Sequence, residues 1–200
     1  MDNNNLIAFL GCIGAGKDFN AKKLIEKGYV QINFADDLRD MCWEILRWKP
    51  ANEQEYEAFK TRYLSGLYED SIEINEEGEE ETFGYAEEPF GLKLTGRQVL
   101  QHLGASLRDR DPEFWVKCWT NKVKKALSEN KKVVCSDARH VNEIQAVMDL
   151  GGTAKFCNYL SSRYSNTDPH ISEALAQGLL KIGFVDGDII SQQVISSFDQ

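Results

Sequence analysis

A strand, a glycine-rich turn and a helix follow one another within the first thirty residues, and this order constrains the fold of the whole chain. The apolar run Leu6–Leu10 predicts a buried strand. It leads directly into Gly11-Cys-Ile-Gly-Ala-Gly16-Lys17, which has the spacing G-x-x-x-x-G-K. Residues 17–27 then have the pattern of a helix, and residues 29–34 predict a second strand. A strand, a helix and a strand of these lengths form a βαβ unit with parallel strands.

The glycine-rich turn has the composition of a loop that holds phosphate groups. Small residues let the backbone N–H groups curl around a phosphate, and the positive end of the following helix points at the same place. Lys17 adds a mobile charge for the terminal phosphates of a nucleotide, so we expect it to be catalytic. The alternative is a glycine-rich turn without a ligand. The predicted ATP contacts are Gly11, Cys12, Ile13, Gly14, Ala15, Gly16, Lys17, Asp18 and Phe19.

Asp18 stands where the usual phosphate-loop pattern has a serine or threonine that binds magnesium. An aspartate is also a hard oxygen donor, so it could hold Mg²⁺ directly or through water. The alternative is a first-turn carboxylate that the helix dipole stabilises.

The rest of the chain alternates between helical and strand patterns, which predicts an α/β fold. We expect a parallel sheet of about five strands with helices on both faces. The chain is interpreted as a single domain, residues 1–200, with a lid-like, substrate-covering insertion at about 51–94. Helices are expected at 38–48, 53–68, 95–107, 112–128 and 142–150, and further strands at 133–135, 154–160 and 188–190. Thr95 and Gln98 have the spacing of a capping box at the start of the third of these helices.

Composition excludes several classes of protein. No apolar run reaches the roughly 18 residues of a membrane helix, and the N-terminus does not resemble a signal peptide, so we expect a soluble protein. Five cysteines without a Cys-x-x-Cys pair indicate a reducing cytoplasm and argue against disulfides and zinc. The net charge of −9 and the absence of basic-aromatic interleaving argue against a nucleic-acid partner. Residues 69–88 carry much of this acidity and have the composition of a solvated loop.

Charged residues follow the strand predicted at 133–135. Asp137 and Arg139 fall at its carboxyl end, where ligands collect in parallel sheets. Asp137 could hold magnesium through water, and Arg139 could neutralise phosphate charge.

Several motifs together resemble the deoxynucleoside monophosphate kinases of tailed bacteriophages. They are Gly16-Lys17-Asp18, Val99-Leu100-Gln101-His102-Leu103-Gly104 with Arg108, Asp111, Phe114, Trp115 and Val116, then Asp137, Arg139 and Glu143, then Asp168, His170, Ser172 and Glu173, and Asp186-Gly187-Asp188. The resemblance covers roughly residues 6–48 and 95–190. It departs from the family after Ser191, where a short tail replaces the usual final helix.

This resemblance implies a P-loop kinase fold, with Mg²⁺-dependent transfer of the ATP γ-phosphoryl group to a deoxynucleoside monophosphate. It also implies a location in the cytoplasm of a host cell. The acceptor bases and the choice between monomer and homodimer stay open. Two other functions are alternatives: a metabolite kinase of the phosphomevalonate or dephospho-coenzyme A type, and an inactive nucleotide-binding regulator.

The resemblance also suggests roles for further residues. For four residues a structural role is the alternative to contact with substrate. Arg39 could form a surface ion pair, Arg97 and Arg108 could simply be solvated, and Trp115 could pack in the core beside Trp119. The expected magnesium ligands are Asp18 and Asp137, the expected catalytic residues are Lys17, Arg139 and Arg163, and the expected substrate contacts are Arg39, Arg97, Arg108, Trp115, Asp137 and Arg139.

Overall fold

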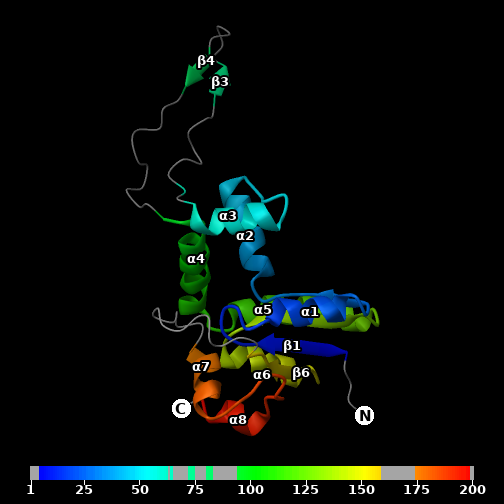
Figure 1. The fold of residues 1–200 in the computed structure, drawn as a ribbon. Helices are drawn as coiled ribbons and strands as arrows, with labels where there is room; N and C mark the ends of the chain where they lie inside the picture. Colours follow the sequence, from blue (N-terminus) through cyan, green and yellow to red (C-terminus); the bar gives the residue numbers. More distant parts are fainter. Residues whose placement is uncertain are drawn as a thin grey trace. The chain divides into compact units, whose positions relative to one another are not determined.

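The computed structural model describes residues 5–62, 64, 72–74, 80–82, 94–158 and 174–198, with 72–74 and 80–82 described by backbone alone. The chain divides into two compact units (Figure 1). Met1–Asp37 and Pro112–Gln200 form unit 1, and Leu38–Asp111 form unit 2. One kinase domain with an insertion stays a prediction.

The elements of unit 1 alternate between strand and helix for most of its length. They are β1 (Leu6–Leu10), α1 (Lys17–Ile25), β2 (Tyr29–Gln31), α5 (Phe114–Ser128), β5 (Lys132–Ala138), α6 (Val141–Asp149), β6 (Thr153–Phe156), α7 (Ala174–Lys181) and α8 (Gln192–Ser196). Helix α2 (Asp36–Leu46) begins at the end of this unit and continues into the next.

The sheet of unit 1 has the strand order β2-β5-β1-β6, and all neighbouring strands are parallel. Ile7 in β1 lies opposite Val134 in β5 and Thr153 in β6. Every residue of β1 is buried, as expected for a strand between two layers of helices. This architecture confirms the α/β prediction and is compatible with a P-loop kinase fold.

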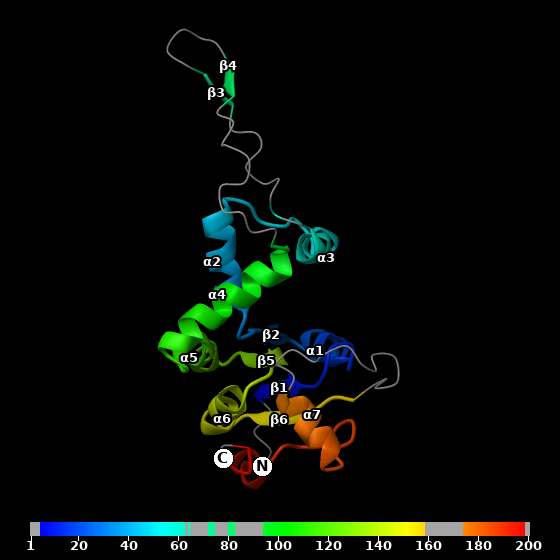
Figure 2. The same cartoon turned by 90° about the vertical axis from the view of Figure 1, so that its left-hand side faces the viewer.

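Helices cover both faces of the sheet. Leu6, Ala8 and Leu10 point to one face, where they join a core cluster with Trp119 of α5 and Ile144 of α6. The alternate residues of β1 point to the other face and pack with Ala21 of α1. Figure 2 shows α1 on one side of the strands and α5 and α6 on the other.

The prediction of a fifth strand at 188–190 is wrong, because the sheet has four strands. Ile189 makes only an isolated antiparallel bridge to Lys155 of β6. A turn precedes this bridge, in which Gly187 has φ +90° and the Asp188 carboxylate accepts from the Val185 N–H. Ser191 then becomes the N-cap of α8. The segment between the turn and the cap is therefore too short to extend along β6.

Other boundaries differ from those predicted. β2 ends at Gln31 and β6 ends at Phe156, both earlier than expected. The tail expected after Ser191 forms α8, whose Ile195 is buried in the core of unit 1. Helix α7 was not predicted, although Leu175, Ala176 and Leu179 form a buried stripe along it. In the described parts of the chain, no helix has both the length and the apolar character needed to cross a membrane.

Unit 2 holds most of α2, α3 (Glu53–Thr61) and α4 (Gly96–Arg110), together with the antiparallel pair β3 (Ile72–Ile74) and β4 (Glu80–Thr82). Its core contains Cys42, Trp43 and Phe59, and the Trp43 and Phe59 rings meet edge to face with centroids 4.9 Å apart. The capping box predicted from Thr95 and Gln98 is confirmed at the start of α4. α3 ends at Thr61, earlier than the predicted 68. The covering role of residues 51–94 stays a prediction.

Candidate active site

The turn between β1 and α1 has the backbone of a phosphate loop. Gly14 and Gly16 have φ values of 77° and 86°, in the left-handed region that a residue with a Cβ enters at a cost. Gly16 is the N-cap of α1, so the first N–H groups of that helix face the space enclosed by the turn. The positive end of the helix dipole points to the same place, which suits an anion.

The side chain of Lys17 folds back onto this loop. Its ammonium group donates to the carbonyl oxygens of Gly11 at 2.7 Å and Cys12 at 2.9 Å, and the residue is only 9% exposed. Lys17, the residue expected to contact phosphate, thus holds the backbone of the loop in place. A phosphate oxygen of higher negative charge could replace these carbonyl oxygens without a change in the path of the backbone.

The loop also packs closely against the end of β6. A Cβ added to Gly11 would overlap the carbonyl oxygen of Cys157, and the Cys157 N–H donates to the Leu10 carbonyl at 2.7 Å. Burial raises the pKa of the Cys157 thiol, so this thiol is a packing group at neutral pH. The first glycine of the motif is therefore required by packing.

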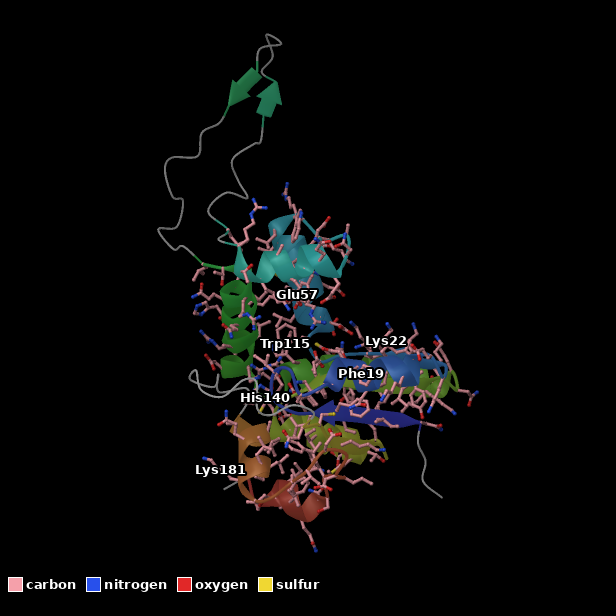
Figure 3. All side chains as sticks on the ribbon, viewed as in Figure 1. Phe19, Lys22, Glu57, Trp115, His140 and Lys181 are labelled. Carbon is pink, nitrogen blue, oxygen red and sulfur yellow. The ribbon has the colours of Figure 1, made fainter. Side chains whose placement is uncertain are left out.

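Asp18 and Phe19 continue α1 from the loop, and both residues are exposed. Oδ1 of Asp18 accepts a hydrogen bond of 2.7 Å from the hydroxyl of Ser136 in β5. Phe19 is 61% exposed and lies on α1 (Figure 3). The Lys23 ammonium lies 4.2 Å from the centre of its ring. The Phe19 side chain therefore contacts its own helix, so any contact of this residue with phosphate would come from its backbone N–H.

Asp137 joins the end of β5 to the segment that follows β2. Its Oδ1 and Oδ2 accept from the backbone N–H groups of Phe34 at 2.8 Å and Ala35 at 3.0 Å. The Cys135 thiol also donates to Oδ1 at 3.3 Å, and burial raises the pKa of this thiol well above its usual range. The contacts give Asp137 a clear structural role beside its predicted one.

Arg139 lies between β5 and α6 and is half-buried. Its N–H and that of His140 both donate to Oε2 of Glu143, at 2.7 Å and 3.1 Å. Glu143 is buried, and this pair of bonds fixes the first turn of α6. Glu143, which the sequence marks as part of a motif, thus holds the backbone that carries Arg139.

In unit 2, Arg39 in α2 is tied to Tyr56 in α3. The Arg39 Nε–H donates to the Tyr56 hydroxyl oxygen at 3.2 Å, and the guanidinium carbon lies 5.4 Å from the ring centre. The ammonium of Lys60 lies 4.7 Å from the same ring. Two cationic groups therefore share one aromatic ring, and each makes a cation–π contact with it.

Arg97 and Arg108 lie at opposite ends of α4. Arg97 is exposed in the first turn, and its charge helps to lower the pKa of Glu57, behind the larger effect of the hydrogen bond from Lys60. Arg108 is half-buried in the last turn. At a rise of about 1.5 Å per residue, eleven positions separate the two by roughly 16 Å along the axis. The structure does not bring these two arginines to one phosphate group.

Trp115 is only 2% exposed, and its ring meets that of Phe114 edge to face with centroids 4.9 Å apart. Phe34 stacks on the neighbouring Trp119 with a centroid distance of 4.2 Å. This burial is the core packing that the sequence raised as an alternative, and stacking of Trp115 on a base stays a prediction. Arg163, Asp168, His170, Ser172 and Glu173 lie outside the described residues.

The comparison with known families decides the class of this chain. A model of the family described as deoxynucleotide monophosphate kinase matches residues 71–193, which is more than half of the 200 residues. The chain belongs to the deoxynucleotide monophosphate kinase family. No curated protein matches the chain. The family is one of phosphotransferases, so the function predicted from the resemblance is confirmed, and neither the metabolite kinase nor the inactive regulator finds support.

The match covers only part of the candidate site of this deoxynucleotide monophosphate kinase. Arg97, Arg108, Asp137 and Arg139 lie inside the matched residues, whereas the loop at 11–19 and Arg39 precede them. The assignments to individual residues therefore rest on geometry and on sequence pattern.

Sequence reasoning missed three residues of this deoxynucleotide monophosphate kinase: Ser136 and Asn33 near the carboxyl ends of the strands, and Tyr56 in α3. Ser136 is 2% exposed and bonds to Asp18, and the Asn33 side-chain oxygen accepts from the Ser136 N–H at 2.9 Å. A signal was available for Ser136, because a polar residue inside the apolar run Val133–Cys135 and Ala138 must be buried with a hydrogen-bond partner. The role of Tyr56 had no such signal, since its partner Arg39 lies on a different helix.

Proposed function

We propose that this deoxynucleotide monophosphate kinase uses ATP with Mg²⁺ as its phosphoryl donor and binds the ATP phosphates in the loop at 11–19. The observation that carries the proposal is the Lys17 ammonium, bonded at 2.7 Å to the Gly11 carbonyl within a loop that precedes a helix N-terminus. A cation and the first backbone N–H groups of α1 belong to the same turn, and this supports the binding of a phosphate group there. The predicted contacts from Gly11 to Phe19 follow from this assignment.

The reaction needs positioning and neutralisation of charge more than acid–base catalysis. An oxygen of the dNMP phosphate attacks the γ-phosphorus of ATP, and the bond from that phosphorus to the β-phosphate oxygen breaks. The products are dNDP and ADP, and no proton has to be removed from the attacking oxygen. Lys17 would move from the loop carbonyls to the donor phosphates and stabilise the charge on the transferring group.

The acceptor phosphate is assigned to the arginines. Arg39 presents a planar guanidinium group, which can bind two phosphate oxygens at once. Arg139, Arg97 and Arg108 are further candidates, and Arg163 is assigned to the transferring group. Asp137 and Trp115 stay candidates for contact with the nucleoside of the acceptor. Because Arg97 and Arg108 are separated along α4, we assign them to different parts of the substrates rather than to one phosphate group.

The residues at the start of α1 fit magnesium. Mg²⁺ prefers oxygen ligands and usually keeps several waters beside one or two carboxylates and the substrate phosphates. The described residues contain no group of three or more His, Cys, Asp or Glu that could hold a metal alone. The exposed Asp18 carboxylate, with Asp137 as a second candidate, matches this sparse pattern of ligands. When bound, the ion would neutralise phosphate charge.

The test is an ADP-release assay with ATP and Mg²⁺, run with each of dAMP, dGMP, dCMP, dTMP and dUMP and with the corresponding ribonucleotides. Release that depends on at least one dNMP is expected, and the comparison gives the base specificity. A parallel run replaces ATP with GTP, and dNMP-dependent release of GDP without any release of ADP from ATP would overturn the choice of donor. Release without any acceptor, or with none of the dNMPs, would contradict the proposed reaction.

A further inference from the structure

Ser136 is a buried polar residue at the point where β5 meets the start of α1. The residue is 2% exposed, and its neighbours Cys135 and Ala138 are fully buried. A buried hydroxyl must be hydrogen-bonded or it costs stability. The bonds that this hydroxyl makes therefore stabilise the local structure.

The geometry fixes the direction of the Ser136 hydroxyl proton. Gln31 donates from Nε2 to Ser136 Oγ at 2.9 Å, which uses a lone pair of that oxygen. Two acceptors remain for the proton, Asp18 Oδ1 at 2.7 Å and Asn33 Oδ1 at 3.5 Å. Asn33 Oδ1 already accepts from the Ser136 backbone N–H. The shorter bond to a carboxylate is the stronger one, so the proton points to Asp18.

This bond holds one oxygen of an otherwise exposed side chain. Asp18 lies in the first turn of α1, where a short side chain has several rotamers available. Among the residues that the structure describes, Oδ2 of Asp18 has no hydrogen-bond partner. Ser136 thus fixes the carboxylate through Oδ1 and leaves Oδ2 for a ligand beside the loop.

We propose that Ser136 is a positioning residue, whose hydroxyl holds the Asp18 carboxylate in the orientation that binds the magnesium ion of the magnesium–nucleotide complex. The common phosphate loop carries its hydroxyl directly after the lysine. Here a carboxylate occupies that position, and the hydroxyl comes from β5 instead. The inference rests on the proposed function, because it takes the loop to be the nucleotide site.

Calorimetric binding of the β,γ-imido analogue of ATP, in Mg²⁺ and in EDTA, tests this role. Ser136→Ala is expected to weaken binding about tenfold in Mg²⁺, which is the lower range for a hydrogen bond to a charged group. In EDTA the same variant should bind the analogue as the wild type does. Ser136→Thr, which keeps a hydroxyl, should bind the analogue in Mg²⁺ as tightly as the wild type does. In an Asp18→Ala background, Ser136→Ala should cause no further loss of affinity for the analogue in Mg²⁺.

Two controls separate positioning from general damage. Ser128→Ala removes a hydroxyl that bonds only to the carbonyl of Lys125 on an exposed surface, and it should leave binding unchanged. Gln31→Ala removes the Nε2–H that donates to Ser136 Oγ and so orients its hydroxyl. It should weaken binding of the analogue in Mg²⁺, and by less than Ser136→Ala does. Because Gln31 is exposed, this variant tests the role of the hydroxyl even if Ser136→Ala fails to fold.

The outcomes distinguish this inference from the function on which it rests. Equal weakening in Mg²⁺ and in EDTA, or a further loss in the Asp18→Ala background, would overturn the role of Ser136 and leave the phosphate loop in place. If the wild type binds the analogue equally well in Mg²⁺ and EDTA, the magnesium assignment itself is wrong and the role of Ser136 fails with it.

Discussion

Arg39 and Tyr56 hold each other across two helices of unit 2, through a hydrogen bond of 3.2 Å from Nε to the phenol oxygen and a guanidinium-to-ring distance of 5.4 Å. The bond uses Nε–H, and the Tyr56 ring lies beside the guanidinium group. Tyr56 in turn packs edge to face on Trp43, with centroids 6.1 Å apart. An arginine that would otherwise be flexible is thus oriented by the core of its unit.

Tyr56→Phe is expected to raise the KM for dNMP by about fivefold with little change in kcat, because it removes a hydrogen bond worth about 1 kcal/mol and keeps the ring. Steady-state kinetics with dNMP as the varied substrate measures this. Lys60→Met removes the other cation over the same ring and should leave the acceptor KM unchanged. A rise of the KM for ATP instead would contradict the assignment of Arg39 to the acceptor.

Lys17→Met should lower kcat by at least about 100-fold, because the variant loses a charge that stabilises the transferring phosphoryl group. The coupled assay with saturating ATP and dNMP measures the loss. Lys22→Met is the matched control, since Lys22 is exposed on the same helix. Turnover near that of the wild type in Lys17→Met would remove the loop from the active site.

Gly96→Ala should destabilise unit 2 by about 1–3 kcal/mol, the usual range for overpacking. A Cβ at Gly96 would overlap the Phe59 carbonyl oxygen and lie 2.5 Å from Cε1 of its ring. Urea unfolding followed by tryptophan fluorescence reports on this region, because Trp43 packs against Phe59.

Gly104→Ala is the control for this change on the same helix. Its Cβ would meet only the end of the Leu38 side chain, at 3.1 Å, and that side chain can move aside. The urea midpoint of Gly104→Ala should therefore lie closer to that of the wild type. Equal losses in the two variants would show that the contact with Phe59 is not the cause.

Cys42 should make stability depend on alkaline pH. Burial raises the pKa of its thiol from 9.0 to about 11. Between these values the unfolded chain releases a proton that the folded chain keeps, so the free energy of unfolding falls as the pH rises. Urea unfolding of the wild type and of Cys42→Ala at pH 8 and pH 10.5 should show the difference between them shrinking at the higher pH. A constant difference would contradict the raised pKa.

The sequence predicted those parts of the fold that depend on local pattern. β1, α1 and the capping box at Thr95 each follow from residues that lie next to one another, and all three are confirmed. The fifth strand was predicted from the apolar pair Ile189 and Ile190, but the turn at Gly187 and the N-cap at Ser191 leave it no length.

In the candidate site, too, the local motif could be predicted from the sequence, whereas the contacts between distant residues could not. The phosphate loop is visible as a motif because its function requires consecutive residues. Ser136 and Asp18 are separated by 118 positions, and only the pairing of β1 with β5 brings their elements together. The structural bonds of Asp137 to Phe34 and Ala35 depend likewise on the pairing of β2 with β5. Sequence pattern alone contains no information on that order of strands.

The position of β5 between β2 and β1 has a consequence for synthesis on the ribosome. β1 and β2 leave the ribosome early, but the strand that joins them is made only after all of Leu38–Asp111. At about 5–20 residues per second, roughly five to twenty seconds pass between β2 and β5. Unit 2 is continuous in the chain and can close its core during that time, while the first two strands lack a partner. Nascent chains that stall before Lys132 should therefore be protected from protease in unit 2 and remain sensitive in β1 and α1.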